Sequence, residues 1–305
     1  MSGAPPVPGR FHCPVCGGPV TPPLDGESFV ACDHCGNTLP LRDGIIALDP
    51  PASDRDYPHE LVDLVSRVED RHFWFAARRD VILSALRHIT AGKERKQALD
   101  VGCGNGFMMA ALEGAGLAMS GIDMHWSALA RARTRVLGPL FCSTATTLPF
   151  LPDFDLVTLL DVIEHVDDDV SVLDEARRVL APGGHAIVTV PAGPALWSTY
   201  DELIGHKRRY DRPALVAALQ RAHFEVRYVS YFNCPLILAA AARRWTGRAQ
   251  DARSVDGADV VRRALRVPPA PLNALLRWVI RAEAPLRRLP WIRGGSLIAV
   301  ARRPD

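Results

Sequence analysis

Three glycines at alternate positions give this sequence its clearest chemical feature. Gly102, Gly104 and Gly106 follow the apolar stretch 97–101, and helical spacing resumes after the last of them. The pattern predicts a buried strand, a sharp turn and the start of a helix. Glycine has no Cβ, so the backbone can turn tightly and a ligand can approach the peptide N–H groups. We therefore expect a nucleotide-binding loop that includes Asn105.

Two acidic residues indicate which kind of nucleotide the loop binds. Dinucleotide-binding loops carry a third glycine where this chain has Phe107, and Asp100, just before the first glycine, would repel a pyrophosphate. Asp123 closes the next predicted strand. With these acids, the loop resembles that of class I S-adenosylmethionine (SAM) methyltransferases. The resemblance implies that Asp123 binds the ribose hydroxyls of SAM and that Asp100 and Met124 also contact the cofactor. The alternative is a glycine-rich turn without a ligand.

A second loop is expected at the adenine ring. Residues 143–150 follow the third predicted strand and resemble the D-A-x-x-L-P-F segment that brackets adenine in the same family. The resemblance implies adenine contacts from Thr144 and Ala145. Thr144 replaces the acid that usually accepts a hydrogen bond from the adenine amino group. A hydroxyl accepts this bond more weakly than a carboxylate does.

Titratable side chains follow the predicted strand 154–160. Asp161, Glu164 and His165 stand at its carboxyl end, where parallel α/β sheets place their chemistry. His165 is suited to general-base catalysis, and the three side chains could hold a divalent ion. The segment resembles the E-x-x-E-H motif of ubiquinone-biosynthesis O-methyltransferases, which binds such an ion. Two alternatives are open. Asp161 and Glu164 could act as polar groups on the cofactor and in catalysis, or Glu164 and His165 could merely fix the loop.

Aromatic residues precede the glycine loop at high density. Residues 69–79 contain Trp74, Phe75 and Arg78, and they open a helix expected to run to about residue 89. Such a cluster suits a lid that excludes water from a bound cofactor. A similar H-F-W-F-x-x-R segment occurs in many bacterial class I methyltransferases, which implies that Arg78 meets the methionine carboxylate of SAM. The alternative is a core-packing helix with solvated arginines.

An insertion over residues 194–210 follows the fifth predicted strand and is expected to form the roof of the acceptor site. His206 could accept a proton near neutral pH, which makes it a second candidate base. Arginine binds carboxylates and phosphates in a bidentate manner, so the roof could hold an anionic acceptor. A similar G-H-x-R-R-Y motif occurs in the same bacterial methyltransferases. The alternative is a salt-bridged helix cap. The expected acceptor contacts are Trp197, Tyr200, Arg208, Arg209 and Tyr210.

Four cysteines near the N-terminus have metal-ligand spacing. Cys13, Cys16, Cys32 and Cys35 form C-x2-C-x15-C-x2-C, which predicts a closed, structural Zn²⁺ site in a zinc ribbon. Two disulfides or a redox pair are the alternatives. The following residues 39–48 resemble the last strand of the small zinc proteins that activate tRNA and protein methyltransferases. The ribbon therefore looks fused to its own methyltransferase.

Composition supports two further predictions, one on localisation and one on the C-terminal insertion. The chain has 305 residues, of which 48% are hydrophobic, with no secretory signal or transmembrane run, so we expect a cytoplasmic protein. Fourteen arginines but five acidic residues lie between positions 240 and 305. The insertion 234–293 has apolar stretches rimmed by arginine, with Trp245, Trp278 and Trp291. It could cap the pocket, pair two subunits or lie on an anionic membrane.

These features predict an N-terminal zinc ribbon (1–49), a linker with lid helices (50–96) and a methyltransferase domain (97–305). The expected core is a seven-stranded, doubly wound α/β sheet. The function expected is SAM-dependent methylation, on oxygen rather than nitrogen, of a small-molecule or lipid-linked acceptor. One alternative is an rRNA or tRNA methyltransferase that binds RNA through the ribbon and the C-terminal arginines. The other is a non-catalytic zinc-ribbon scaffold. The acceptor's identity and the oligomeric state are not predicted.

Overall fold

The computed structural model describes residues 11–21, 28–49, 59–86, 89, 96–234, 257–283 and 293–305. Several sequence predictions lie outside the described residues. They concern residues 1–10, the linker after Asp49, and about half of the insertion 234–293, including Trp245 and Trp291.

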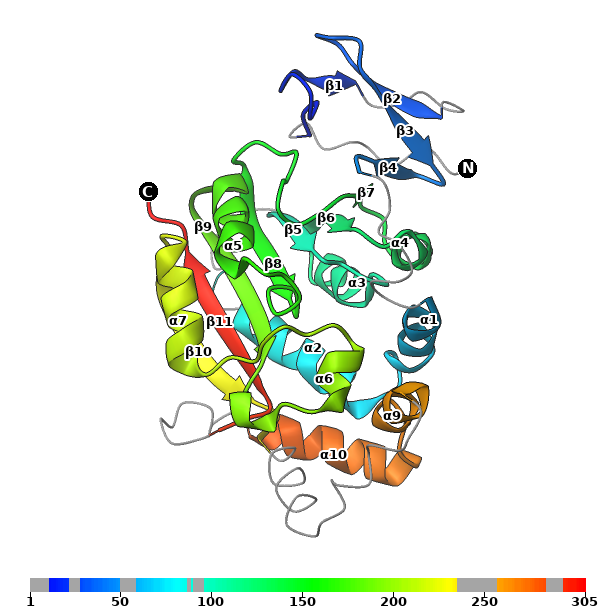
Figure 1. The fold of residues 1–305 in the computed structure, drawn as a ribbon, viewed down its shortest axis with the longest axis vertical. Helices are drawn as coiled ribbons and strands as arrows, with labels where there is room; N and C mark the ends of the chain where they lie inside the picture. Colours follow the sequence, from blue (N-terminus) through cyan, green and yellow to red (C-terminus); the bar gives the residue numbers. More distant parts are fainter. Residues whose placement is uncertain are drawn as a thin grey trace.

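In the described part of the chain, eleven strands form one mixed sheet (Figure 1). Seven of them have the order β7-β6-β5-β8-β9-β11-β10, in which β7 to β9 run parallel and β11 is antiparallel to both neighbours. This arrangement confirms the predicted doubly wound α/β sheet. The bounds are β5 Gln97–Val101, β6 Ala118–Asp123, β7 Leu140–Cys142, β8 Phe154–Leu160, β9 Leu180–Pro191, β10 Glu225–Phe232 and β11 Ser296–Arg302.

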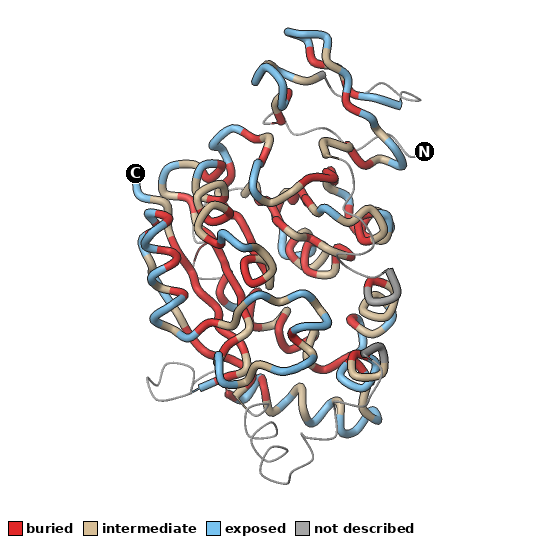
Figure 2. Tube along the Cα trace, viewed as in Figure 1, coloured by how far each residue is buried: buried red, intermediate tan, exposed pale blue. Residues whose placement is uncertain are grey.

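The helices that flank the sheet are α2 Phe73–Leu86, α3 Phe107–Gly114, α4 Trp126–Ala132, α5 Asp169–Val179 and α7 Arg212–Arg221. They cover both faces because successive side chains of a strand point to opposite sides. Leu99 and Val101 of β5 pack in one core with α5 and α7. Ala98 of the same strand packs in a second core with α2, α3 and α4. Figure 2 shows the central strands buried along most of their length.

The described residues up to Asp49, where the zinc ribbon is predicted and which we call the ribbon, extend this sheet at the β7 edge. Its strands are β1 Val20–Thr21, β2 Phe29–Cys32, β3 Thr38–Arg42 and β4 Ile45–Ala47. They pair antiparallel with one another, and β4 then pairs parallel with β7. The ring of Phe11 also packs against Phe141 of β7, with centroids 5.0 Å apart. The ribbon and the α/β core therefore share a backbone ladder and an aromatic contact.

The remaining helices lie beyond the carboxyl ends of the parallel strands (Figure 1). They are α1 His59–Val68, the short 3-10 helix η1 Pro194–Leu196, α6 Thr199–Leu203, α9 Gly257–Ala264 and α10 Ala270–Ala282. Phe75 of α2 and Tyr200 of α6 pack around the buried Val261 and Leu265. These contacts join the predicted lid and roof to the C-terminal insertion.

Helix α10 packs along α2 through Ile280, which lies against Phe73 and Ala77, and through polar contacts. Asn273 donates to the carbonyl oxygen of Arg71 at 2.7 Å and accepts from the backbone N–H of Phe73 at 2.9 Å. Arg281 adds a 2.6 Å contact to Asp80. The insertion thus fixes the start of the lid helix. Among the described residues, no helix has both the length and the apolar composition that a membrane crossing requires.

Candidate active site

The four ribbon cysteines converge on one point. Their Sγ atoms all lie within 4.8 Å of one another, with 3.5 Å between Cys16 and Cys32 and 3.8 Å between Cys13 and Cys35. Four thiolates about 2.3 Å from one Zn²⁺ ion would be separated by about 3.8 Å in a tetrahedron. These separations far exceed the S–S bond length of about 2.05 Å. The donor set therefore fits a structural Zn²⁺ ion.

A cleft of about 1880 Å³ opens at the carboxyl ends of the parallel strands. It is lined by the glycine loop, by Asp123 and Met124, and by Thr144 and Ala145. The lid residue Trp74 also lines it. The structure thus brings together segments that lie far apart in the sequence. Other predicted residues in its walls are Arg78, Asp161, Glu164, His165, Trp197, Tyr200, His206 and Arg209.

The glycine loop is fixed by Asp123. Gly102, Gly104 and Gly106 all have positive φ, at 74°, 52° and 75°. Residues other than glycine rarely adopt this backbone conformation. The backbone N–H of Gly104 donates to Asp123 Oδ2 at 2.9 Å, and the N–H of His125 donates to Asp123 Oδ1 at 2.8 Å. The carboxylate therefore stands beside the loop, where a nucleoside hydroxyl could reach it.

Asp100 is buried behind the same loop. Its Oδ1 accepts a hydrogen bond of 2.5 Å from the hydroxyl of Thr158. Burial raises the pKa of the Asp100 carboxyl to about 7, although Thr158 and Arg78 act in the opposite direction. Asp100 therefore changes its charge near neutral pH, next to the expected site of a cationic cofactor.

This position of Asp100 predicts pH-dependent binding of SAM. Below the pKa of about 7 the carboxyl is neutral, and above it the carboxylate attracts the positive charges of SAM. Affinity should therefore rise by up to roughly tenfold per pH unit as the pH increases towards 7, and then level off. Calorimetric titrations between about pH 5.5 and 8 would measure the slope. In Asp100→Asn the slope should vanish, and a flat profile in the wild type would contradict the assignment.

The ribbon reaches the expected adenine loop through a residue that the sequence analysis missed. Asp49 Oδ2 accepts from the hydroxyl of Ser143 at 2.5 Å and from the backbone N–H of Thr144 at 3.1 Å. Ser143 N–H in turn donates to the carbonyl oxygen of Asp123 at 3.0 Å. Asp49 stood at the border of the predicted linker, and no local pattern pairs it with a loop 95 positions away.

Arg78 and Asp161 form an ion pair inside the cleft. Arg78 Nη2 lies 2.8 Å from Asp161 Oδ2 and donates to Thr189 Oγ1 at 3.1 Å. The hydroxyl of Thr189 donates to Asp161 Oδ1 at 3.0 Å, so both carboxylate oxygens have partners. The guanidinium of Arg78 lies over the ring of Trp74, 5.4 Å from its centroid. Asp161 is therefore directed at Arg78, not at an ion shared with Glu164 and His165.

A different residue joins Glu164 and His165. The ligand-capable atoms of Glu164, His165 and His206 lie within 4.8 Å of one another, and we call these three residues the carboxylate–histidine cluster. Burial raises the pKa of Glu164 well above its usual value, and nearby Asp161 adds to the effect. Burial, followed by repulsion from His206, lowers the pKa of His165 to about 4. Glu164 and His165, which follow β8, thus lie next to His206 of the predicted roof.

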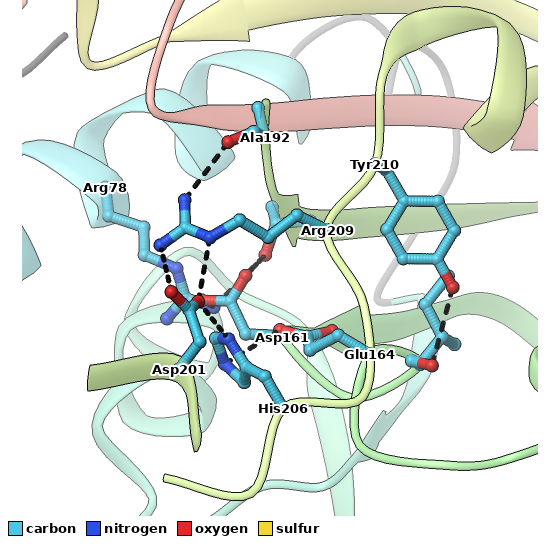
Figure 3. A network of polar contacts seen from close by, with 10 residues as sticks. Arg78, Asp161, Glu164, Ala192, Asp201, His206, Arg209 and Tyr210 are labelled. Atoms are coloured by element: carbon cyan, nitrogen blue, oxygen red, sulfur yellow. Dashed lines mark hydrogen bonds and ion pairs between the residues drawn. The ribbon is translucent and has the colours of Figure 1, made fainter. Parts of the chain in front are cut away.

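The roof motif holds His206 in place (Figure 3). The buried Asp201 accepts from His206 Nδ1 at 2.8 Å and from Arg209 Nε and Nη2 at 2.8 and 3.0 Å. Arg209 also donates to the carbonyl oxygen of Ala192 at 3.1 Å. Sequence reasoning missed Asp201, although its five-residue spacing to His206 within a predicted roof offered a weak signal.

The other expected acceptor contacts also have partners within the protein. Arg208 donates to the carbonyl oxygens of Val166 and Asp167 at 2.8 and 2.6 Å. The buried Tyr210 donates its hydroxyl to Asp169 at 2.7 Å, and neither Arg208 nor Tyr210 lines the cleft. These contacts, with the Arg209–Asp201 pair, favour a structural role for the arginines and the tyrosine. Trp197 and Tyr200 do line the cleft.

The part of the chain that contains the glycine loop and the residues after β8 is also the part that resembles a known family. Residues 99–188 match the family described as methyltransferase domain. The ubiquinone biosynthesis O-methyltransferase of Alkalilimnicola ehrlichii is 38% identical over 113 residues, covering 34% of this chain and 45% of that protein. The protein of the same name from Pseudomonas aeruginosa is 35% identical over 106 residues, covering 32% and 46%. The chain therefore spans slightly less than half of these curated relatives.

Two solved structures share the fold with a TM-score of 0.55 each. One belongs to the complex between the Haloferax volcanii Trm112 methyltransferase activator and a methyltransferase, at 20% identity, covering 83% of this chain and all of that chain. The other is Haemonchus contortus phosphoethanolamine N-methyltransferase 2 with bound SAM, at 18% identity, covering 83% and 59%. Residues 99–188 are therefore similar to a methyltransferase domain, and the described part of the chain shares its fold with these two methyltransferase structures.

Proposed function

We propose that this protein transfers the methyl group of SAM to a hydroxyl group of a small or lipid-linked acceptor. One observation carries the proposal. A single cleft is lined at one end by the glycine loop and Asp123 and at the other by the carboxylate–histidine cluster. The first group suits a nucleoside, and the second suits a polar atom that must lose a proton. The names of the two curated relatives, both O-methyltransferases, support oxygen as the acceptor atom.

In this proposal the donor lies along the carboxyl ends of β5, β6 and β7. Asp123 accepts hydrogen bonds from the ribose hydroxyls, and the backbone of the glycine loop approaches the sugar and the methionine. Trp74 and Arg78 close over the methionine end. The adenine lies against a set of residues at the ends of β6 and β7, namely Met124, Thr144 and Ala145.

The chemistry needs little more than position and a path for one proton. The acceptor oxygen attacks the sulfonium methyl carbon in line, the S–CH3 bond breaks, and its electron pair stays on sulfur. The hydroxyl proton departs towards the carboxylate–histidine cluster. Aromatic walls at Trp74, Trp197 and Tyr200 would exclude water from this step. A hydroxyl on an apolar ring or chain would fit such walls best.

RNA methylation is less well supported by the charges of the described residues. Arg281 pairs with Asp80, Arg302 with Asp305, and Arg262 with Asp259, so these arginines have acidic neighbours. Binding to tRNA should therefore be weak even at low salt. Filter binding at several salt concentrations checks this, and a steep salt dependence of tight binding would favour the RNA alternative.

The test of the proposed function measures the released product, S-adenosylhomocysteine. The full chain would be incubated with SAM and matched panels of phenols, aliphatic alcohols, amines and tRNA. Turnover should require a hydroxyl compound and should fail with its methyl ether, which already carries the methyl group. An absence of SAM binding by calorimetry would leave the scaffold alternative. Turnover on amines or tRNA alone would overturn the choice of acceptor.

A further inference from the structure

We propose that Glu164, His165 and His206 hold one divalent transition-metal ion, and that His206 replaces Asp161 as the third ligand. The inference deepens the proposed function, because it concerns the acceptor end of the same cleft. It differs from the ligand set that the sequence motif suggests, in which all three ligands would follow β8. Here one ligand comes from the roof.

Glu164 gives the first reason. Its side chain is fully buried, and neither carboxylate oxygen has a hydrogen-bond partner on another described residue. A buried carboxyl without partners is costly, and a bound cation would satisfy it. His206 Nε2 lies 3.9 Å from Glu164 Oε1. Two donors that share one metal ion at about 2.1 Å lie roughly 3 to 4 Å apart, so this spacing fits.

The position of Asp161 gives the second reason. Asp161 has a φ of 60°, which non-glycine residues rarely adopt, and its two oxygens are taken by Arg78 and Thr189. Recruiting Asp161 to an ion beside Glu164 would break the 2.8 Å contact with Arg78 and leave a nearly buried guanidinium without its partner. That loss is expensive, so Asp161 is a poor ligand here.

Asp201 gives the third reason. It accepts from Nδ1 of His206 at 2.8 Å, which leaves Nε2 as the lone-pair nitrogen on the side of Glu164. Ligand histidines usually donate their second ring nitrogen to a carboxylate in this way. Arg209 and the hydroxyl of Ser198, 3.0 Å from Asp201, hold that carboxylate in turn. The roof motif therefore orients an imidazole towards the ion.

The donor set indicates the kind of ion. Two imidazoles and one carboxylate suit Mn²⁺, Fe²⁺, Co²⁺ or Zn²⁺, whereas Mg²⁺ and Ca²⁺ prefer oxygen donors. Such an ion would supply Lewis acidity beside the acceptor hydroxyl. Because Glu164 and His165 follow β8 while His206 belongs to the roof, the ion would also tie the roof to the sheet.

The site can be tested by adding Mn²⁺ alone to the full-length protein, after its four ribbon cysteines have been loaded with zinc. Mn²⁺ prefers oxygen and imidazole ligands to thiolates, so it should leave the ribbon unchanged. Loss of the free Mn²⁺ electron paramagnetic resonance signal should report one bound ion per chain. His206→Gln and Asp201→Asn should weaken binding by about 10- to 100-fold. Asp161→Asn, the matched variant from the motif, removes no ligand in this proposal and should weaken binding much less than either of these two substitutions.

A spectrum of the wild-type protein keeps the test independent of how the variants fold. Electron spin-echo modulation of bound Mn²⁺ should show two coordinated imidazole nitrogens, from His165 and His206. A single imidazole would indicate the ligand set that contains Asp161 and would overturn the proposal. Failure to bind Mn²⁺ at millimolar concentration would do the same. Affinity for SAM, titrated on the same sample, separates this outcome from a failure of the proposed function.

Discussion

Replacing Asp123 with alanine should lower the affinity for SAM by about 100- to 10,000-fold. In the proposed complex the Asp123 carboxylate accepts both ribose hydroxyls, and hydrogen bonds to a charged group contribute about 1.5 to 3 kcal/mol each. Two such bonds correspond to this range of affinity. The variant also loses the 2.9 Å contact that holds the Gly104 N–H, so the glycine loop becomes less well ordered for binding. Calorimetric titration with SAM measures the effect.

A matched substitution separates this effect from a general loss of stability. Asp174→Ala removes a carboxylate from the outer side of α5, where the side chain is 44% exposed and does not line the cleft. It should bind SAM like the wild type. Both variants should keep melting temperatures within a few degrees of the wild type. An Asp123→Ala protein that binds SAM with unchanged affinity would remove Asp123 from the cofactor site.

Cys32→Ser should release zinc and disorder the ribbon, with a further loss of SAM affinity. Four-thiolate zinc sites supply about 10 to 16 kcal/mol of apparent binding energy, which a ribbon this small needs in order to fold. When β4 leaves the edge of β7, Asp49 no longer holds Ser143 and Thr144. Two hydrogen bonds on the adenine loop are then lost. At about 1 kcal/mol each, this predicts roughly a tenfold to thirtyfold weaker SAM complex.

Three measurements follow this prediction: zinc content, amide exchange of β3 and β4, and calorimetric titration with SAM. Cys234→Ser, outside the ribbon, is the control and should keep one zinc per chain. Asp49→Asn isolates the loop contact, because it leaves the cysteines in place and should weaken SAM binding alone. Unchanged amide protection of β4 in Cys32→Ser would show that the ribbon folds without its metal.

The sequence determined the parts of the protein that depend on local patterns. Alternating apolar strands, the glycine turn after Val101 and the acid at the end of β6 follow from residues close together in the chain. Helix α5 begins with a local contact of the same kind, in which the Asp168 side chain accepts from the N–H groups of Val170 and Ser171. The cysteine spacing predicted a cluster for similar reasons, because each C-x2-C turn is a local unit.

Tertiary structure alone decided which charged groups meet. Arg78 of α2 pairs with Asp161, which follows β8, and its contact with the methionine carboxylate stays a prediction. Arg209, an expected acceptor contact, lines the cleft and pairs with Asp201. Local spacing does not encode these partners, because long side chains choose among several opposite charges by burial and hydrogen bonding once the chain has folded.

The residues of the site likewise come together only when the chain folds. From the sequence, Glu164, His165 and His206 are candidates for catalysis. The motif groups the first two with Asp161, because those residues are neighbours in the chain. Folding brings the roof over the end of β8, and His206 comes within 3.9 Å of Glu164. Asp49 likewise reaches the expected adenine loop because β4 pairs with β7. The sequence by itself determined the glycine loop and the acid at the end of β6, because these depend on residues close together in the chain, whereas contacts between distant segments decided which side chains meet beside β7 and β8.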